Sequence, residues 1–205
     1  MKTDKGILFV FSGPSGSGKG TILGKFNEIY PNNNMMYSVS ATTREPRKGE
    51  VDGVNYHFKS VEEFQNMIDN DDFLEWAKFC DNHYGTPKKP IYDSIDKCVD
   101  VILEIDTVGA LNVKEKYPEA VMIFVLPPSL TVLEERLRDR GTETEETLNK
   151  RFNKAVEEIK KAGKYDYIIV NDNLDEAVTE FNSIITSERL KTKINKNTIS
   201  EVLKK

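Results

Sequence analysis

The hydrophobic positions of the chain alternate between short apolar runs and stripes at helical spacing. The run Ile7–Phe11 (ILFVF) is apolar at every position, which is typical of a strand buried on both faces of a parallel sheet. A glycine-rich turn follows, and apolar residues then recur at helical spacing from Ile22 to Tyr30. The chain is therefore predicted to begin as strand, turn and helix.

The same alternation returns in the second half of the chain. Apolar runs predict core strands at Val99–Ile105, Ala120–Leu126 and Tyr165–Val170. Helical stripes are predicted at Ser129–Arg140, Thr144–Lys161 and Asp175–Leu190. Strands that alternate with helices indicate an α/β fold with a parallel sheet flanked by helices.

The pattern divides one domain into four parts. The core is predicted to comprise residues 1–34, 90–128 and 162–190. Residues 35–89 break into short polar pieces, with one helix opened by the capping box Ser60-x-x-Glu63, and are interpreted as an insertion. Residues 129–161 form a helical region. The Lys- and Asn-rich tail, residues 191–205, is expected to extend the last helix or to fray.

Composition narrows the class of protein. With 38% hydrophobic and 31% charged residues among 205, the chain has the balance of an ordinary globular protein. Its longest apolar run is far shorter than the ~20 residues of a spanning helix, so we expect no membrane association and a cytoplasmic location. A net charge of -5 disfavours nucleic-acid binding. Cys80 and Cys98 form no metal-binding pattern and are expected to be reduced.

The turn after the first strand carries the motif GxxxxGK. Glycines there allow successive backbone N–H groups to face a phosphate, the helix N-terminus adds a positive dipole, and Lys19 adds a charge. Gly20 stands where Ser or Thr normally contacts Mg²⁺, so Thr21 becomes the candidate metal contact. The predicted ATP-binding residues are Gly13, Pro14, Ser15, Gly16, Ser17, Gly18, Lys19, Gly20 and Thr21.

A second candidate anion site lies in the insertion. Arg44 and Arg47 flank a proline in TTREPRKGE, and two guanidinium groups at this spacing can converge on one phosphate. A solvated charged loop is the alternative interpretation.

Several separate segments of the chain resemble the guanylate kinase family. They are SVSATTREPRKGEVDGVNYHF, FLEWAKF, NHYGTP, LEIDTVGA and RGTETEETLNKR ahead of IVND, in the order of the family and at similar spacing. The resemblance implies a P-loop kinase core with a GMP-binding subdomain at 35–89 and a short helical lid at 129–161. It further implies phosphoryl transfer from ATP to GMP, and also to dGMP, with Mg²⁺ as cofactor.

The resemblance assigns the acceptor site residue by residue. Arg44, Arg47 and Tyr56, helped by Tyr84, are implied to bind the GMP phosphate. A carboxylate that accepts from guanine N1–H and N2–H₂ makes a contact that adenine cannot reproduce, so Glu75 is expected to select the base. The alternatives are an exposed acid at Glu75 and tyrosines that only pack. The residues implied on the guanine side are Ser40, Glu75, Thr86 and Asp106.

The resemblance also assigns the lid. Arg136 and Arg140 share a helix face, and with Arg151 they are implied to close over the ATP phosphates, acting in catalysis with Lys19 and Arg44. Surface salt bridges to nearby glutamates are the alternative. Two further residues follow core strands. Glu104 is a candidate that orients Mg²⁺ through water, and Asn171 resembles the adenine-side contact.

Two other functions remain open at this point. A guanylate-kinase-like module that recognises phosphopeptides would share the fold, although such modules tend to lose the phosphate loop. A P-loop kinase for AMP or a pyrimidine monophosphate would share the donor site, although Glu75 and Asp106 argue against it. The chain departs from the family pattern at Val108 and at His83, which is expected to be an exposed loop residue. A monomer and a homodimer are both compatible with the sequence.

Overall fold

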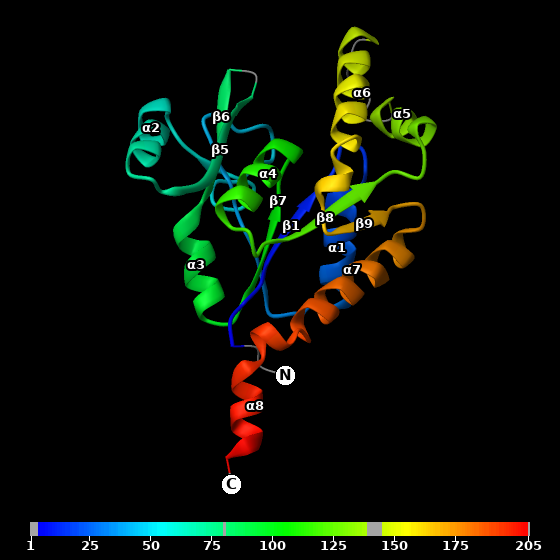
Figure 1. The fold of residues 1–205 in the computed structure, drawn as a ribbon. Coiled ribbons are helices and arrows are strands. Elements are labelled where there is room, and N and C mark those ends of the chain that lie inside the picture. The colour runs from blue at the N-terminus through cyan, green and yellow to red at the C-terminus, as the bar shows by residue number, and fades with distance from the viewer. Residues whose placement is uncertain (1–3, 80, 139–144, 205) are drawn as a thin grey trace.

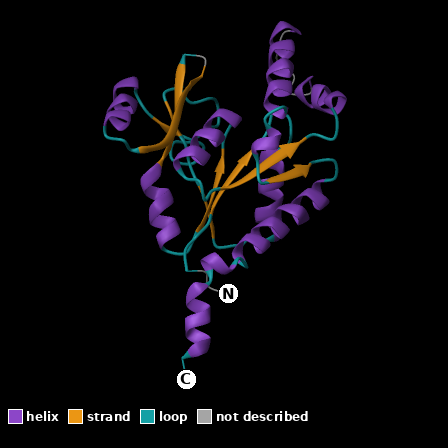
Figure 2. Ribbon diagram, in the orientation of Figure 1, coloured by secondary structure: helices purple, strands orange, loops and turns teal. Residues whose placement is uncertain are grey.

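The protein contains two β-sheets, a larger one in the body of the molecule and a smaller one near one end of it (Figures 1 and 2). The computed structural model describes residues 4–79, 81–138 and 145–204. Helices cover both faces of the larger sheet, and the smaller sheet projects from one of its ends. This arrangement confirms the predicted α/β class.

The larger sheet has five strands, all parallel, in the order β2-β7-β1-β8-β9. The central strand is β1, and the three strands predicted in the second half of the chain are confirmed. Because all strands run in the same direction, the loops at their carboxyl ends meet along one edge. The strands are β1 (Leu8–Ser12), β2 (Met35–Tyr37), β7 (Asp100–Glu104), β8 (Val121–Leu126) and β9 (Tyr167–Val170).

The continuous apolar run of β1 is explained by its two covered faces. Phe9 and Phe11 pack with residues of α1 (Lys19–Ile29) and α7 (Leu174–Arg189). Leu8 and Val10 point to the other face and pack with α3 (Lys88–Asp96) and α4 (Thr107–Lys116). Because successive side chains of β1 point to opposite faces of the sheet, the strand contributes to two separate hydrophobic clusters.

The insertion forms a four-stranded sheet in the order β4-β3-β6-β5. Helix α2 (Val61–Asp69) covers it with Phe64, and the predicted capping box is present at Ser60 and Glu63. His83, expected in a loop, instead lies in β6 and pairs through its backbone with Thr43. The strands are β3 (Ala41–Thr42), β4 (His57–Phe58), β5 (Phe73–Phe79) and β6 (Asn82–Pro87).

One predicted boundary is wrong. Residues 35–37 were placed in the insertion, but Met35–Tyr37 forms β2 and pairs in parallel with β7 of the larger sheet. The three residues are too few to show the period of a strand, and only pairing with the distant β7 places them. The insertion therefore begins after Tyr37.

The helical region consists of α5 (Leu130–Arg138) and α6 (Glu145–Ile159), which pack on each other through Leu133, Leu137 and Leu148. Both helices and the insertion rise from the same end of the larger sheet, on opposite sides of the edge where the strands finish (Figure 1). That edge is therefore where a ligand can contact both.

The tail does not continue α7. After α7 the chain makes one 3₁₀ turn, η2 (Thr192–Ile194), and then forms a separate helix, α8 (Lys196–Leu203). Another 3₁₀ turn, η1 (Ala162–Lys164), lies between α6 and β9. Asp4 fastens this junction, since its N–H donates to the Ile194 carbonyl and its carboxylate accepts from the Asn197 N–H. Helix α8 extends from the end of the body opposite to α5 and α6 (Figure 1).

The structure describes one of the two cysteines. Cys98 is half-buried at a positive φ of 60°, and its thiol contacts the Asp4 carbonyl at 3.5 Å. Cys80 lies outside the described residues. Among the residues that the structure describes, no helix has both the length and the apolar character needed to cross a membrane.

A buried carboxylate connects the first strand to the last long helix. Asp100, almost inaccessible to solvent, accepts from the Ile7 N–H at 2.8 Å and from Arg189 Nε at 2.6 Å. Arg189 also donates to the Asn33 carbonyl at 2.7 Å, so one ion pair joins three segments that are distant in sequence.

We predict that Asp100→Ala lowers the free energy of unfolding by about 3 kcal/mol, because a buried N–H and a partly buried guanidinium lose their acceptor. Urea unfolding of the two proteins measures this difference. The matched control is Asp93→Ala, which removes an exposed pair with Lys89 and should change the free energy of unfolding much less. Equal effects of the two substitutions would contradict the interpretation.

Candidate active site

The turn between β1 and α1 is shaped for an anion. Gly13, Gly16 and Gly18 all have positive φ, at 148°, 90° and 88°, a region that residues with a side chain rarely adopt. Gly18 is the N-cap of α1 and no side chain caps it. The first N–H groups of the helix are therefore available to a ligand at its positive end.

Lys19 lies folded over this turn. Its ammonium donates to the Gly13 carbonyl at 2.7 Å and to the Pro14 carbonyl at 3.1 Å. Both acceptors are carbonyls of the turn itself, so the ammonium lies over the loop where phosphate oxygens would bind. The role of Lys19 in binding phosphate stays a prediction.

Asn171, which directly follows β9, hydrogen-bonds through its side chain to the turn between β1 and α1. Its amide donates to the Ser17 carbonyl at 2.8 Å, and its side chain is buried. A Cβ on Gly18 would come within 2.1 Å of this amide nitrogen, so only glycine fits there. Gly18 is thus required both by its backbone conformation and by this close approach.

The lid arginines reach the same turn from α5 and α6. Arg136 donates to the Asn171 carbonyl at 3.0 Å, and Arg151 donates to the Ser15 hydroxyl at 2.7 Å. The buried Nη1 of Arg136 has no hydrogen-bond partner within the described part of the chain. The neighbouring Arg138, which was not among the predicted lid residues, makes salt bridges to Glu134 and Glu145. Arg140 lies outside the described residues.

In the insertion, Arg44 is held by three kinds of contact. Its Nη2 lies 2.9 and 3.0 Å from the two carboxylate oxygens of Glu50, and its Nη1 donates to the Glu45 carbonyl at 2.7 Å. The guanidinium also lies over the Tyr56 ring, 5.4 Å from its centroid. The Glu50 carboxylate raises the pKa of Arg44, and a smaller effect comes from Tyr84.

The two tyrosines of the predicted phosphate site are neighbours. The rings of Tyr56 and Tyr84 meet edge to face at 6.1 Å. Burial raises the pKa of Tyr56, the nearby Tyr84 adds to this, and Arg44 opposes it. The phenol of Tyr56 is therefore a neutral hydrogen-bond donor at physiological pH. Packing and donation to an anion are compatible roles for this ring.

Glu75 is buried, which contradicts the alternative of an exposed acid. Only 6% of the residue is accessible, and its Oε1 accepts from the Thr86 hydroxyl at 2.6 Å. Burial raises the pKa of Glu75, the Thr86 hydroxyl lowers it, and the Asp106 carboxylate raises it. A Cβ on Gly109 would lie 2.9 Å from Glu75 Oε2, so a glycine in α4 makes room for this carboxylate.

Asp106 caps α4, and Ser40 precedes β3 by one residue. One carboxylate oxygen of Asp106 accepts from the N–H groups of Val108 and Gly109, each at 2.9 Å. The Ser40 carbonyl accepts from the His57 N–H at 2.9 Å. Glu75, Thr86 and Asp106 thus come together from β5, β6 and α4, where the insertion meets the larger sheet.

The two candidate metal contacts are not equivalent. A Cβ built on Gly20 lies 4.0 Å from Glu104 Oε1, so this carboxylate faces the position of the missing hydroxyl. The protein around Glu104 raises the pKa of its carboxyl, and the Lys19 charge opposes this. Thr21 is the next residue of α1, turned by about 100° around the helix. Oxygen donors beside a phosphate loop fit a divalent cation, and Glu104 has the better place.

Comparison with known proteins agrees with this geometry. A family model described as guanylate kinase matches residues 5–188. The chain belongs to the guanylate kinase family. Guanylate kinases from Carboxydothermus hydrogenoformans and Halalkalibacterium halodurans are 53% and 52% identical to it, covering 92% and 93% of both chains in each pair. A crystal structure of guanylate kinase from Anaplasma phagocytophilum superposes with a TM-score of 0.76 at 35% identity, covering 93% of this chain and 90% of that one.

The structure brings the predicted guanylate kinase residues into two groups. The residues predicted to bind ATP surround the N-terminus of α1, and those predicted to bind GMP lie in the insertion and at the start of α4. Sequence reasoning missed Glu50, which contacts Arg44 and Arg47 at once. The signal was present in the spacing Arg47-Lys48-Gly49-Glu50, since a glycine before the last position favours a turn that returns the acid to Arg47.

We predict that Glu75→Gln stabilises the fold at neutral pH. Because burial raises the pKa of Glu75, the folded state binds this proton more tightly than the unfolded chain, and its stabilising effect is lost as the pH rises. Glutamine cannot ionise and keeps an oxygen for Thr86. Thermal or urea unfolding at about pH 7.5 should favour the variant, and the difference should shrink towards about pH 4. A difference independent of pH would show that ionisation of Glu75 is not the cause.

Proposed function

We propose that this chain transfers the γ-phosphoryl group of ATP to GMP, and also to dGMP, producing ADP and the nucleoside diphosphate. The observation that carries the proposal is the placement of two separate cationic groups around one sheet edge. Lys19, Arg136 and Arg151 surround the phosphate turn, while Arg44 and Arg47 lie in the insertion beside the buried Glu75. Membership of the family supports the same pair of substrates.

The donor phosphates would bind at the N-terminus of α1. Backbone N–H groups of the turn from Gly13 to Thr21 would donate to them, and Lys19 would exchange its carbonyl partners for phosphate oxygens. Arg136, Arg140 and Arg151 would add charge from the lid, with the orphan Nη1 of Arg136 as one donor. Asn171 would lie on the adenine side.

The acceptor would bind between the insertion and α4. Arg44, Arg47, Tyr56 and Tyr84 present donors that suit a phosphate dianion. Glu75 would accept hydrogen bonds from the guanine edge, with Ser40, Thr86 and Asp106 as further contacts. A buried carboxylate left without donors is costly, so adenine, which presents the wrong edge, should be rejected strongly.

The reaction needs positioning and positive charge more than covalent participation by the protein. Negative charge is spread over the oxygens of the transferred group, which Lys19 and the arginines would stabilise during in-line transfer. A kinase of this family generally needs a divalent metal, which we propose is Mg²⁺, held near Glu104 and Thr21 to neutralise phosphate charge. Lid closure would exclude water, whose attack would hydrolyse ATP.

We predict that the protein releases ADP rapidly with GMP, more slowly or equally with dGMP, and at least about a thousandfold more slowly with AMP, UMP or CMP. A coupled ADP-release assay with each acceptor measures this directly. Fast turnover with AMP and none with GMP would refute the assignment. If ATP protected the fold against heat but no acceptor were phosphorylated, a kinase for another acceptor would be indicated. If ATP gave no protection, a binding module would be indicated.

We also predict that Lys19→Ala lowers kcat/KM by about a hundredfold or more, because one preorganised charge next to the transferred group is lost. The fold should remain intact, which circular dichroism and thermal unfolding can verify. Lys25→Ala is the control on the same helix, where it removes an exposed pair with Glu28. Wild-type turnover in Lys19→Ala would remove this lysine from the mechanism.

A further inference from the structure

We propose that Glu50 is a positioning residue that holds Arg44 and Arg47 together in the arrangement that receives the acceptor phosphate. The inference rests on the proposed function, since it assigns a role to a residue beside the GMP site. Glu50 is not one of the donors that would touch the phosphate. Its effect would be exerted through the two arginines.

The geometry places one carboxylate between two arginines. Both oxygens of Glu50 lie within 3.0 Å of Arg44 Nη2, and Oε2 also accepts from the Arg47 N–H at 2.7 Å. The Glu50 N–H donates in turn to the Arg47 carbonyl at 3.0 Å, which closes a tight turn. Glu50 therefore fixes the side chain of one arginine and the backbone of the other.

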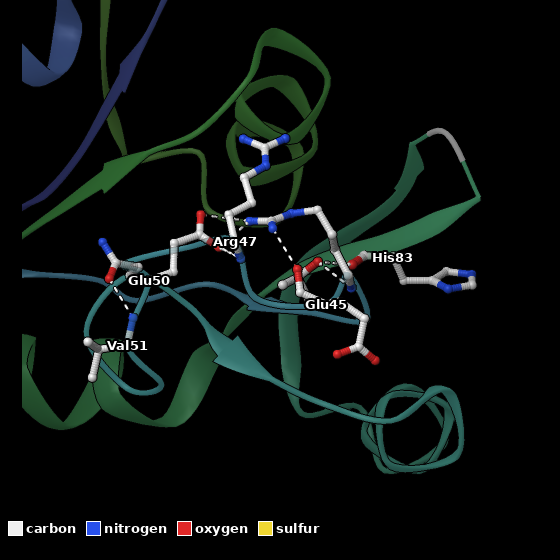
Figure 3. A network of polar contacts seen from close by, with 8 residues as sticks. Glu45, Arg47, Glu50, Val51 and His83 are labelled. Carbon is white, nitrogen blue, oxygen red and sulfur yellow. Dashed lines mark hydrogen bonds and ion pairs between the residues drawn. The ribbon is translucent and has the colours of Figure 1, made fainter.

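Figure 3 shows the consequence for Arg47. Its guanidinium extends away from the Glu50 carboxylate, and the described residues give it no hydrogen bond or ion pair. Arg44, by contrast, is only 14% exposed and is fixed over the Tyr56 ring. The loop thus holds the Arg44 guanidinium in place and leaves the Arg47 guanidinium extended. Two guanidinium groups arranged in this way can contact one phosphate from two sides.

Electrostatics explain why a carboxylate is needed here. Two guanidinium groups kept on one short loop repel each other when no phosphate is bound, and the Glu50 carboxylate on the same loop reduces that repulsion. The Arg44 guanidinium and the Arg47 N–H lower the pKa of Glu50, so its carboxylate is charged at every physiological pH. A preorganised site loses less entropy when the ligand binds, which increases affinity.

The sign of the change in GMP affinity when Glu50 is removed tests the proposal. If Glu50 instead competed with the phosphate for Arg44, its removal would strengthen GMP binding. Three features favour positioning: Glu50 contacts the backbone of Arg47 as well as a side chain, Arg44 is fixed by Tyr56 and the Glu45 carbonyl too, and one Arg44 nitrogen carries both Glu50 contacts. The guanidinium of Arg47 is left for the ligand.

The experiment compares Glu50→Gln with Glu45→Gln. Both substitutions remove one negative charge from the same loop, but the exposed Glu45 carboxylate points away from the network in Figure 3. Binding of GMP, guanosine and a non-hydrolysable ATP analogue to each full-length protein is measured by calorimetry, together with KM and kcat for GMP. Guanosine lacks the phosphate and therefore reports the base site alone.

We expect Glu50→Gln to weaken GMP binding about tenfold or more, with KM rising by a similar factor and kcat changing much less. Binding of guanosine and of the ATP analogue should be unchanged, and Glu45→Gln should resemble the parent protein. Unchanged or tighter GMP binding in Glu50→Gln would overturn the proposal, as would an equal loss of guanosine binding, which would indicate general disruption of the insertion. If the parent protein fails to phosphorylate GMP, the proposed function fails first, independently of Glu50.

Discussion

The whole arrangement depends on the end of β1, where a strand at the centre of a parallel sheet turns directly into a helix. Gly13, Gly16 and Gly18 give this turn a backbone conformation that exposes N–H groups, and Asn171 packs where any side chain on Gly18 would lie. Because β1 is central, the loops after β7, β8 and β9 end beside the same turn. The acidic residues after β7 and the amide after β9 are positioned by this topology, and the lid and the insertion extend from the same edge.

A site that collects positive charge must also be stable without its ligands. The described cations of the site are held in different ways. Lys19 donates to loop carbonyls, Arg136 to a strand-end carbonyl and Arg151 to a serine hydroxyl. Arg44 is paired with the Glu50 carboxylate and lies over two aromatic rings. The proposed acceptor site therefore combines charge with a rigid local geometry.

Much of this could be predicted from the sequence because the decisive signals are local. The four apolar runs of the core, the capping box at Ser60 and the glycine spacing of the phosphate turn each occupy a few adjacent residues. The failures have a common cause, which is dependence on distant partners. Met35–Tyr37 becomes a core strand only through β7, and the tail departs from α7 through contacts with Asp4. His83 lies in β6 because it pairs with Lys78 of β5. The spacing before Glu50 favours a turn, but only the folded loop shows that this acid contacts the side chain of Arg44 as well as the backbone of Arg47.

The two buried or enclosed carboxylates show why recognition and stability conflict at such an edge. Glu75 and Glu104 both have raised pKa values because the protein limits their hydration, and each lies where a ligand would supply the missing partners. Guanine would donate to one, and a hydrated cation would approach the other. For the buried Glu75, ionisation in the free protein is costly, and the proposed hydrogen bonds from guanine would offset that cost and so make the choice of acceptor selective. Gly109, where a Cβ would lie 2.9 Å from Glu75 Oε2, is the backbone position that leaves room for the Glu75 carboxylate.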